Sequence, residues 1–573
     1  MTNDSITYSP PRPRAVLNLL ILAAIILLAV MLRLHFLDWV TIDWDEDLYR
    51  AYAQDLLRGK MLYRDIWDHK PPGIFYLFAV IQALHPSITF FRLVGIACSV
   101  ADGLLLYAIA RRLWNPQAGC AAFLAWTVAT CPHWGAESNS ELFFTFFTLA
   151  SVCFFVKAID GLFPPVGATL CGRPSVQQRQ THVGGHAGPP LPSLRKVEEI
   201  RRSPLVAPAS GRPGMERTDK KCRPEAGAII SSHVPGPMAG ASVPAPLMLV
   251  AGFLAGLAFQ IKPVTLADFA AILAAVFITL PAVRMRVIVW ALIGFLVPSV
   301  LVLAYFGFHG LAREWFYAAY WYNLFYVSEP IPETLSYGPR NLLEVLIENG
   351  PFFVTAAGGL ALLLVREDGK RRWLFALWVL FAFFSVALGL KFLKHYFVQW
   401  LAPLSLLAGY GLYQTKGPRL RLLNITMSAL FYGWVASVTV FQGWDLVERV
   451  KNWRGDGLVY YDVSYRTAVF LNQKLQTGSV YVWRSPSLAI YFLSGRRPTT
   501  RFLFWRHLTR RPIMPWMEQE WKKQMLETPP DVIINSDSYD LPYSSVAFMQ
   551  QFIQQHYRPY RKLDRLTIYQ LRR

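Results

Sequence analysis

The chain has 573 residues, of which 54% are hydrophobic and only 16% are charged. A soluble protein of this length would divide into several domains and would carry about 25% charged residues to cover their surfaces. The composition therefore excludes a disordered chain and a plain soluble enzyme. It predicts an α-helical polytopic membrane protein.

The formal net charge is +20. The basic residues form short clusters between apolar runs, whereas a nucleic-acid binder would gather them on one folded polar domain. Such clusters are typical of cytoplasmic loops that face anionic lipid, so we expect a membrane-lipid environment and no nucleic-acid partner. The six cysteines include no Cys-x-x-Cys spacing and predict neither a cysteine zinc site nor a disulfide framework.

About 11 apolar runs are predicted to span the membrane. The first, Ala15–Leu34, is long enough for a roughly 30 Å hydrocarbon core. Arg12 and Arg14 precede it and no small-residue cleavage site follows, which predicts a retained anchor with a cytoplasmic N-terminus. The later runs are Leu93–Ala110, Ala118–Ala129, Leu142–Val156, Leu247–Gln260, Val264–Leu280, Val287–Phe306, Phe352–Val365, Leu374–Leu390, Phe397–Leu412 and Leu423–Phe441.

The basic clusters give the expected orientation in the plasma (inner) membrane. If odd-numbered spans run outward, the inner loops hold all of the clusters, as the positive-inside rule requires. The long outer loops are then 35–92 and 307–351, with everything after Gln442 also outside, and function is expected there. The inner clusters are Arg111–Arg112, Arg284 with Arg286, Arg366 with Lys370–Arg372, and Lys416 with Arg419 and Arg421.

We expect four parts: a first transmembrane part (1–163), an insert (164–246), a second transmembrane part (247–441) and a C-terminal domain (442–573). The insert holds 14 Pro, 10 Gly and no aromatic residue, so it cannot bury enough apolar area to offset the ordering of its backbone. It is predicted to be a disordered cytoplasmic segment, either a neutral insertion or a lipid- or partner-binding tail. Strand-like runs at Ser479–Trp483, Asp531–Asn535 and Leu566–Leu571, with a helical stretch at Trp516–Glu527, predict a small extracytoplasmic α/β domain.

The first outer loop carries eight acidic residues between His35 and Pro72. Leu48, Tyr52 and Leu56 recur at helical spacing, which predicts an amphipathic helix that starts near Asp45 and lies along the membrane surface. Acids at a helix start complement its dipole, so capping and solvated charge remain one interpretation of these carboxylates.

The order of residues in this loop supports a chemical interpretation as well. Asp45-Glu46-x-x-Tyr49 offers a carboxylate that could take a proton from an acceptor, and Asp68-His69-Lys70-Pro71-Pro72 offers a cation held by a rigid proline pair. Such a pair suits the joining of a hydroxyl or amine to a sugar carried on a lipid phosphate. We therefore expect Asp45 and Lys70 to meet at a wet cavity on the outer side.

With further motifs, this pattern resembles the GT-C glycosyltransferases, in particular the bacterial branch related to protein O-mannosyltransferases and to the aminoarabinose transferase of lipid A. The resemblance covers most of the chain except Pro164–Pro246. Its further motifs are Asn139-Ser140-Glu141, the glycine-rich run Gly252–Pro263, Lys394-His395-Tyr396-Phe397 with Pro403, and the segments Tyr481–Arg484 and Ser487–Arg497.

The resemblance implies an inverting transfer of a sugar from a polyprenyl-phosphate donor to an extracytoplasmic glycan, lipid or protein hydroxyl of the cell envelope. In it, Asp45 with Glu46 is catalytic. Lys70, His395, Lys262 and Tyr396 contact the donor phosphate. For Lys262 a snorkelling interfacial cation, and for His395 an interfacial hydrogen bond, stay open as alternatives.

The resemblance also implies a tentative metal site. Asp45 and Glu141 could hold a divalent Mg, Mn or Ca ion, with Glu137 as a competitor of Glu141; no nucleotide cofactor is expected. The lipid A relatives carry an acid where this chain has His69, which weakens any transfer of their metal ligation or substrate.

The role of the aromatic run Trp315–Tyr326 stays open. It could stack on sugars or line a lipid groove, or it could form an interfacial belt.

The function has alternatives as well. A polytopic transporter or flippase for a lipid or sugar is the second possible function, and a membrane scaffold is the third. A transporter would show an internal repeat or ionisable residues at the membrane midplane. The sequence does not identify the sugar or the acceptor.

Overall fold

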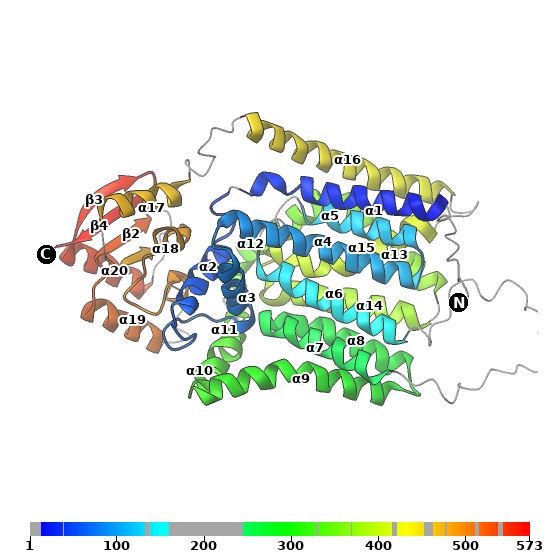
Figure 1. The fold of residues 1–573 in the computed structure, drawn as a ribbon, viewed down its shortest axis with the longest axis horizontal. Coiled ribbons are helices and arrows are strands. Elements are labelled where there is room, and N and C mark those ends of the chain that lie inside the picture. Colours follow the sequence, from blue (N-terminus) through cyan, green and yellow to red (C-terminus); the bar gives the residue numbers. More distant parts are fainter. Residues whose placement is uncertain are drawn as a thin grey trace, which may run out of the picture. The chain divides into compact units, whose positions relative to one another are not determined.

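A computed structural model describes residues 13–37, 39–131, 138–159, 244–327, 331–367, 369–414, 421–451, 462–475, 478–509, 515–536 and 543–572. In this part of the chain, long helices run side by side and end near a small domain with a sheet (Figure 1). The predicted insert 164–246 lies outside the described residues, apart from residues 244–246, which cap and begin the helix α7.

Each of the predicted apolar runs falls on a helix. Among the described residues, six helices are long and apolar enough to cross a membrane, or up to seven if a pair bent by 82° is one span. The multi-pass helical class is confirmed, while the count of about 11 spans stays a prediction. The helices are α1 (Pro13–Met31), α4 (Ile88–Leu113), α5 (Pro116–Ala129), α6 (Ser140–Ile159), α7 (Ala245–Ile261), α8 (Leu266–Thr279), α9 (Arg284–Phe308), α13 (Gly350–Arg366), α14 (Gly369–Ala387), α15 (Phe397–Gln414) and α16 (Arg421–Lys451).

The glycines of the run Gly252–Pro263 let two helices approach closely. A Cβ at Gly252 would overlap the carbonyl oxygen of Ala291, and one at Gly256 would overlap that of Phe295. Small residues at such a contact allow backbones to pack without a gap. The close packing of α7 on α9 fixes the end of α7, where Lys262 is the C-cap.

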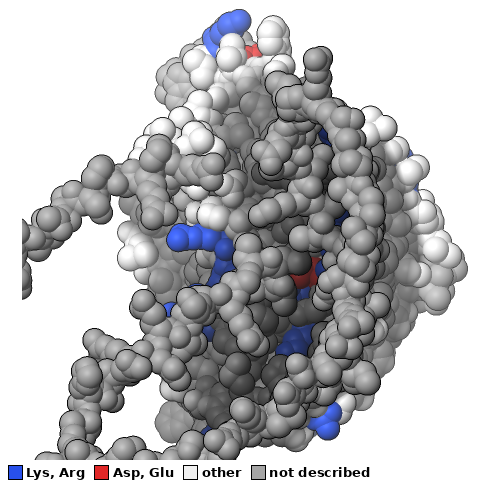
Figure 2. Space-filling view, turned by 90° about the vertical axis from the view of Figure 1, so that its right-hand side faces the viewer, with Lys and Arg blue, Asp and Glu red and all other residues white. Residues whose placement is uncertain are grey.

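The first of the basic clusters lies at the helix end away from the first outer loop. Arg92, near the start of α4, contacts Glu46 of that loop, whereas Arg111 and Arg112 lie in the last turn of α4. Figure 2 looks onto the far end of the helices and shows several basic side chains and little acidic surface among the described residues. This arrangement is the one that the positive-inside rule predicts for a cytoplasmic face.

The first outer loop folds into α2 (Trp44–Leu57) and α3 (Pro72–Leu84). The structure corrects the prediction of an amphipathic surface helix: every residue from Glu46 to Ala53 is buried. The apolar residues Leu48 and Tyr52 are buried, and the opposite face is covered as well, because α18 (Ala489–Ser494) of the C-terminal domain packs on α2.

The long outer loop 307–351 is helical where it is described. It forms α10 (Ala312–Phe316), a π-helical turn η4 (Tyr317–Trp321), α11 (Tyr322–Val327) and α12 (Ile331–Glu348). The short helices η5 (Leu388–Leu390) and η6 (Lys394–Tyr396) connect α14 to α15 on the same side of the bundle.

The C-terminal domain is built on a four-stranded sheet of order β1-β2-β4-β3, in which β1 and β2 are parallel and the other pairs are antiparallel. The three predicted strands match β1 (Val480–Trp483), β2 (Val532–Ser536) and β4 (Leu566–Leu571), and the predicted helix matches α19 (Pro515–Glu527). The sequence analysis missed β3 (Tyr557–Leu563), whose residues are mostly exposed and lack an apolar pattern. The remaining helices are α17 (Val463–Lys474), η9 (Trp505–His507) and α20 (Ser544–His556); α16 extends past the expected boundary at 441.

Arg497 of the C-terminal domain binds the first outer loop. Its Nε donates to Asp55 Oδ1 at 2.6 Å, and its Nη2 donates to Gln54 Oε1 and to the carbonyl of Ala51. All three partners belong to the second half of α2. Since a forked guanidinium held by several acceptors allows little rotation, this contact orients the helix that bears Asp45.

Candidate functional site

A cavity of about 480 Å³ lies where the first outer loop, the helix ends and the C-terminal domain meet. Six of the predicted site residues line it: Asp45, Lys70, Glu141, Lys262, His395 and Tyr396. Residues that are far apart in the sequence thus line one cavity. The spacing of the motifs along the chain does not by itself require them to meet.

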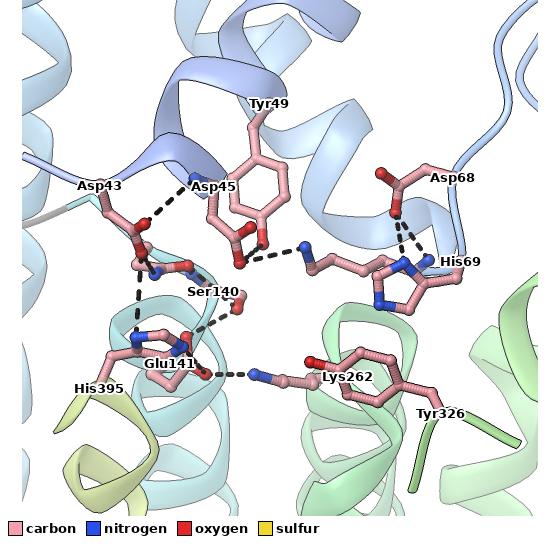
Figure 3. A network of polar contacts seen from close by, with 12 residues as sticks. Asp43, Asp45, Tyr49, Asp68, His69, Ser140, Glu141, Lys262, Tyr326 and His395 are labelled. Carbon is pink, nitrogen blue, oxygen red and sulfur yellow. Dashed lines mark hydrogen bonds and ion pairs between the residues drawn. The ribbon is translucent and has the colours of Figure 1, made fainter. Parts of the chain in front are cut away.

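Asp45 and Lys70 form an ion pair in this cavity. Lys70 Nζ donates to Asp45 Oδ2 at 3.1 Å, and the hydroxyl of Tyr49 lies 3.4 Å from the same oxygen (Figure 3). The local sequence explains both placements. Asp43 caps α2 by accepting from the backbone N–H of Asp45, and Pro71 stands at the N-cap of α3 with its fixed φ directly after Lys70.

The pair is charged at neutral pH. Burial raises the pKa of Asp45, but the charge and hydrogen bond of Lys70, together with His395 and Lys262, outweigh burial and hold this pKa below its usual value. For Lys70, burial alone would lower the pKa. The carboxylate of Asp45 raises it, with Tyr49 and Asp68 acting in the same direction, and the pKa of Lys70 lies well above its usual value.

Glu141 and Lys262 form a second pair. Lys262 Nζ donates to Glu141 Oε1, and the Ser140 hydroxyl donates to the other carboxylate oxygen at 2.8 Å. Lys262 also lies 4.4 Å from the ring centre of Tyr396. A Cβ at Gly73 would overlap the carbonyl oxygen of Gln260, so the glycine after the proline pair allows α3 to touch the end of α7 and brings the two lysines to one cavity.

His395 lies between Asp43 and Glu141. Its ring nitrogens are 3.9 Å from Asp43 Oδ2 and 3.9 Å from Glu141 Oε1. Burial lowers the pKa of His395, so the imidazole is neutral at pH 7. Burial and the charge of Asp45 raise the pKa of Asp43 to about 8, and Asn139 donates to its Oδ2 at 3.0 Å. At neutral pH Asp43 is therefore protonated, while Asp45 carries the negative charge.

The predicted metal pair of Asp45 and Glu141 stays a prediction, with both residues in the lining of the cavity and Glu141 paired with Lys262. A set of three residues that includes Asp45 has its ligand atoms within 4.8 Å of one another: Asp43, Asp45 and His395. These oxygen and nitrogen donors could hold a divalent cation. Glu137, the predicted competitor of Glu141, lies outside the described residues.

Glu46 is not part of the cavity. It is fully buried on the other side of α2, where it pairs with Arg50 at 2.6 Å and with Arg92, and it accepts from the backbone N–H of Ser138 at 3.2 Å. One step along a helix turns a side chain by about 100°, and this turn points Glu46 away from the cavity that Asp45 lines. The position of Glu46 supports a structural role in place of the predicted catalytic one.

The sequence analysis missed several cavity residues. Lys391 Nζ lies 3.5 Å from the ring centre of Tyr326, and Arg506 lies over the ring of Trp44 at 5.2 Å. Lys391 precedes the Lys394-His395 motif by three residues, and this proximity could have pointed to Lys391 in the sequence. Lys394 does not line the cavity but pairs with Glu344 and Glu348. No sequence pattern pointed to Asn323, Gln399 or Arg506, which also line the cavity.

We predict that Glu46→Ala destabilises the protein. It leaves Arg50 and Arg92 buried without their shared carboxylate, and breaking a buried ion pair costs about 3–5 kcal/mol. Thermal unfolding in detergent measures the effect as a large drop in Tm. The control Arg64→Ala removes an exposed ion pair of the same loop and should leave Tm almost unchanged; equal effects of the two variants would contradict the structural role of Glu46.

Comparison with known proteins gives a partial family match. Residues 69–161 match the model of the dolichyl-phosphate-mannose-protein mannosyltransferases, a segment that begins at His69 and includes Glu141. No curated protein sequence matches the chain.

Solved structures match over nearly the whole chain. ArnT from Cupriavidus metallidurans in the apo state gives a TM-score of 0.53 at 13% identity, with 97% of this chain and 98% of that chain covered. The same protein bound to undecaprenyl phosphate gives 0.51 at 12% identity, with 97% of each chain covered. The Archaeoglobus fulgidus oligosaccharyltransferase tethered with an acceptor peptide gives 0.51 at 10% identity, covering 98% of this chain and 74% of that one. The chain therefore has the polytopic GT-C fold that its motifs predicted.

Proposed function

We propose that the protein is an inverting glycosyltransferase, which moves a sugar from a polyprenyl-phosphate donor to an extracytoplasmic acceptor. The observation that carries this proposal is the Asp45–Lys70 pair in the cavity, 3.1 Å apart. A carboxylate and an ammonium in one hollow provide a group that takes a proton and a group that stabilises a leaving phosphate.

The chemistry of the cavity suits a lipid-linked donor. Its lining combines the cations Lys70, Lys262 and Lys391 with apolar side chains such as Val264, Leu388 and Leu393. Cations recognise a phosphate, and apolar walls suit the first isoprene units of its lipid. The structurally similar ArnT has been crystallised with undecaprenyl phosphate, which supports a polyprenyl phosphate as the carrier here.

In the proposed reaction the acceptor hydroxyl oxygen attacks the anomeric carbon of the donor. The bond between that carbon and the phosphate oxygen breaks on the opposite face, so the anomeric centre is inverted and polyprenyl phosphate leaves. Asp45 takes the hydroxyl proton. The cations of Lys70 and Lys262 stabilise the charge that develops on the leaving phosphate, and the cavity holds the reactants in line.

The ion pair also supplies a way to activate Asp45. With Lys70 beside it, Asp45 is ionised but weakly basic, because the cation lowers its pKa. A donor phosphate that draws Lys70 toward itself removes this influence, and burial then raises the pKa of Asp45. The base thus becomes stronger when a donor is bound, which couples proton transfer to occupancy of the phosphate site.

A divalent cation is compatible with the same site. Asp43, Asp45 and His395 would hold it and would orient the carboxylate of Asp45, and the ion would add positive charge beside the donor phosphate. The oxygen donors favour Mg, Mn or Ca, while His395 suits Mn best of the three.

The first test is Asp45→Asn. We expect sugar transfer to fall by roughly 10²–10⁴-fold, since the amide cannot take the proton, while membrane insertion stays normal. Release of polyprenyl phosphate from a panel of polyprenyl-phosphate hexoses and pentoses, with cell-envelope extract as the acceptor, measures transfer. The matched control is Asp65→Asn in the same loop, a partly exposed carboxylate outside the cavity. Full activity of Asp45→Asn would rule out Asp45 as the base, and lipid or sugar translocation without transfer would favour a transporter.

The second test is the pH profile of Lys70→Met. Without the cation, burial dominates and the pKa of Asp45 rises, so the acid limb of kcat/KM should move to higher pH. The KM for the donor should also rise, because a phosphate contact is lost. Lys60→Met, which changes an exposed lysine of the same loop, is the control and should keep both values. An acid limb that stays in place or moves to lower pH would show that Lys70 does not set the pKa of Asp45.

A further inference from the structure

A second group of ionisable side chains, one of which (His69) lines the cavity, has no part in the proposed transfer. It consists of Asp68 and His69 of the first outer loop and His507 of the C-terminal domain, with one ligand atom from each lying within 4.8 Å of the others. All three side chains are buried; Asp68 is fully so, at 0% exposure. The group shares no residue with Asp43, Asp45 and His395.

The separations within this group suit an ion placed between the side chains. Asp68 Oδ1 lies 3.5 Å from His69 Nδ1, and Asp68 Oδ2 lies 3.6 Å from His507 Nε2. These distances are too long for good hydrogen bonds. Each imidazole thus faces a different oxygen of the carboxylate, at a separation close to the roughly 3.3 Å between neighbouring ligands of a tetrahedral zinc ion.

Asp68 supplies an independent indication. Its Oδ2 is buried and accepts no hydrogen bond within the described part of the chain, while Oδ1 accepts from the backbone N–H of Lys70 at 3.0 Å. A buried carboxylate oxygen without a donor is costly, and a bound cation would compensate this cost. The free oxygen is the one that faces His507.

The surroundings hold the two imidazoles in place. The ring of His69 stacks on Tyr326 at 5.2 Å and 28°, and that of His507 meets the edges or faces of Trp67 and Phe504 at 4.9 and 5.1 Å. Metal ligands that packing holds in one orientation lose little entropy when they bind an ion.

We propose that Asp68, His69 and His507 bind a divalent transition-metal ion, Zn²⁺ by its ligand preference. Two imidazoles and one carboxylate leave a fourth tetrahedral position for water, and the nitrogen ligands favour zinc over magnesium or calcium. The ion joins the C-terminal domain to the first outer loop. Because Asp68 and His69 directly precede Lys70, the same ion fixes the backbone that carries this lysine.

The test measures zinc binding and does not depend on the proposed transfer. Full-length protein in detergent is stripped with a chelator, equilibrated with ZnCl₂ and desalted, and its metal content is determined by mass spectrometry. We expect about one zinc per chain in the wild type and at least tenfold weaker binding in His507→Ala. The control His556→Ala changes an exposed histidine of the same domain and should keep the zinc. His395→Ala should keep it too, which separates this site from the group around Asp45.

X-ray absorption of the zinc-loaded wild type covers the case in which His507→Ala does not fold. We expect nitrogen and oxygen neighbours at about 2.0–2.1 Å and no sulfur. A wild type without zinc above background, a sulfur-containing shell, or zinc that His395→Ala removes and His507→Ala retains would each overturn the proposal.

Discussion

The ion pair between Asp45 and Lys70 is the interaction on which the candidate site depends. Each charge is partly withdrawn from water, where an isolated ion would be strongly disfavoured, so each needs the other or a substrate charge in its place. Such a pair is stable while the cavity is empty. When a phosphate enters, Lys70 can bind the phosphate in place of Asp45. The same desolvation that makes the pair costly also makes its charges effective, because solvent screens them less than it would at the surface.

The rest of the structure holds these two charges in position. The position of Asp45 depends on α2. Asp43 caps the start of this helix, Glu46 of its first turn pairs with Arg92 of α4, and Arg497 binds Asp55 near its end. Lys70 depends on the proline pair and on the close contact of Gly73 with the end of α7. The C-terminal domain is thus part of the candidate site, because it packs on α2 and contributes Arg506 to the lining of the cavity.

Much of this arrangement could be predicted from the sequence, for identifiable physical reasons. Apolar runs locate membrane helices because the bilayer tolerates little else. Asp45 and Lys70 stood out because one outer loop offers a carboxylate that could take a proton and a cation held by a proline pair. The catalytic role predicted for Glu46 does not fit its buried position, where it pairs with Arg50 and Arg92. Composition did not reveal that the face of α2 that bears Glu46 is buried in the protein. Contacts such as Glu141 with Lys262, or Asp68 with His507, join residues from distant segments, so only the folded chain shows them.

The most direct test of the account is a structure of the protein, determined by electron cryomicroscopy, with undecaprenyl phosphate bound. We expect density for the phosphate in the cavity, within hydrogen-bonding distance of Lys70 or Lys262. The distance between Lys70 Nζ and Asp45 Oδ2 should then exceed the 3.1 Å of the empty cavity. Lipid phosphate bound elsewhere, with the cavity closed to it and the ion pair unchanged, would contradict the account.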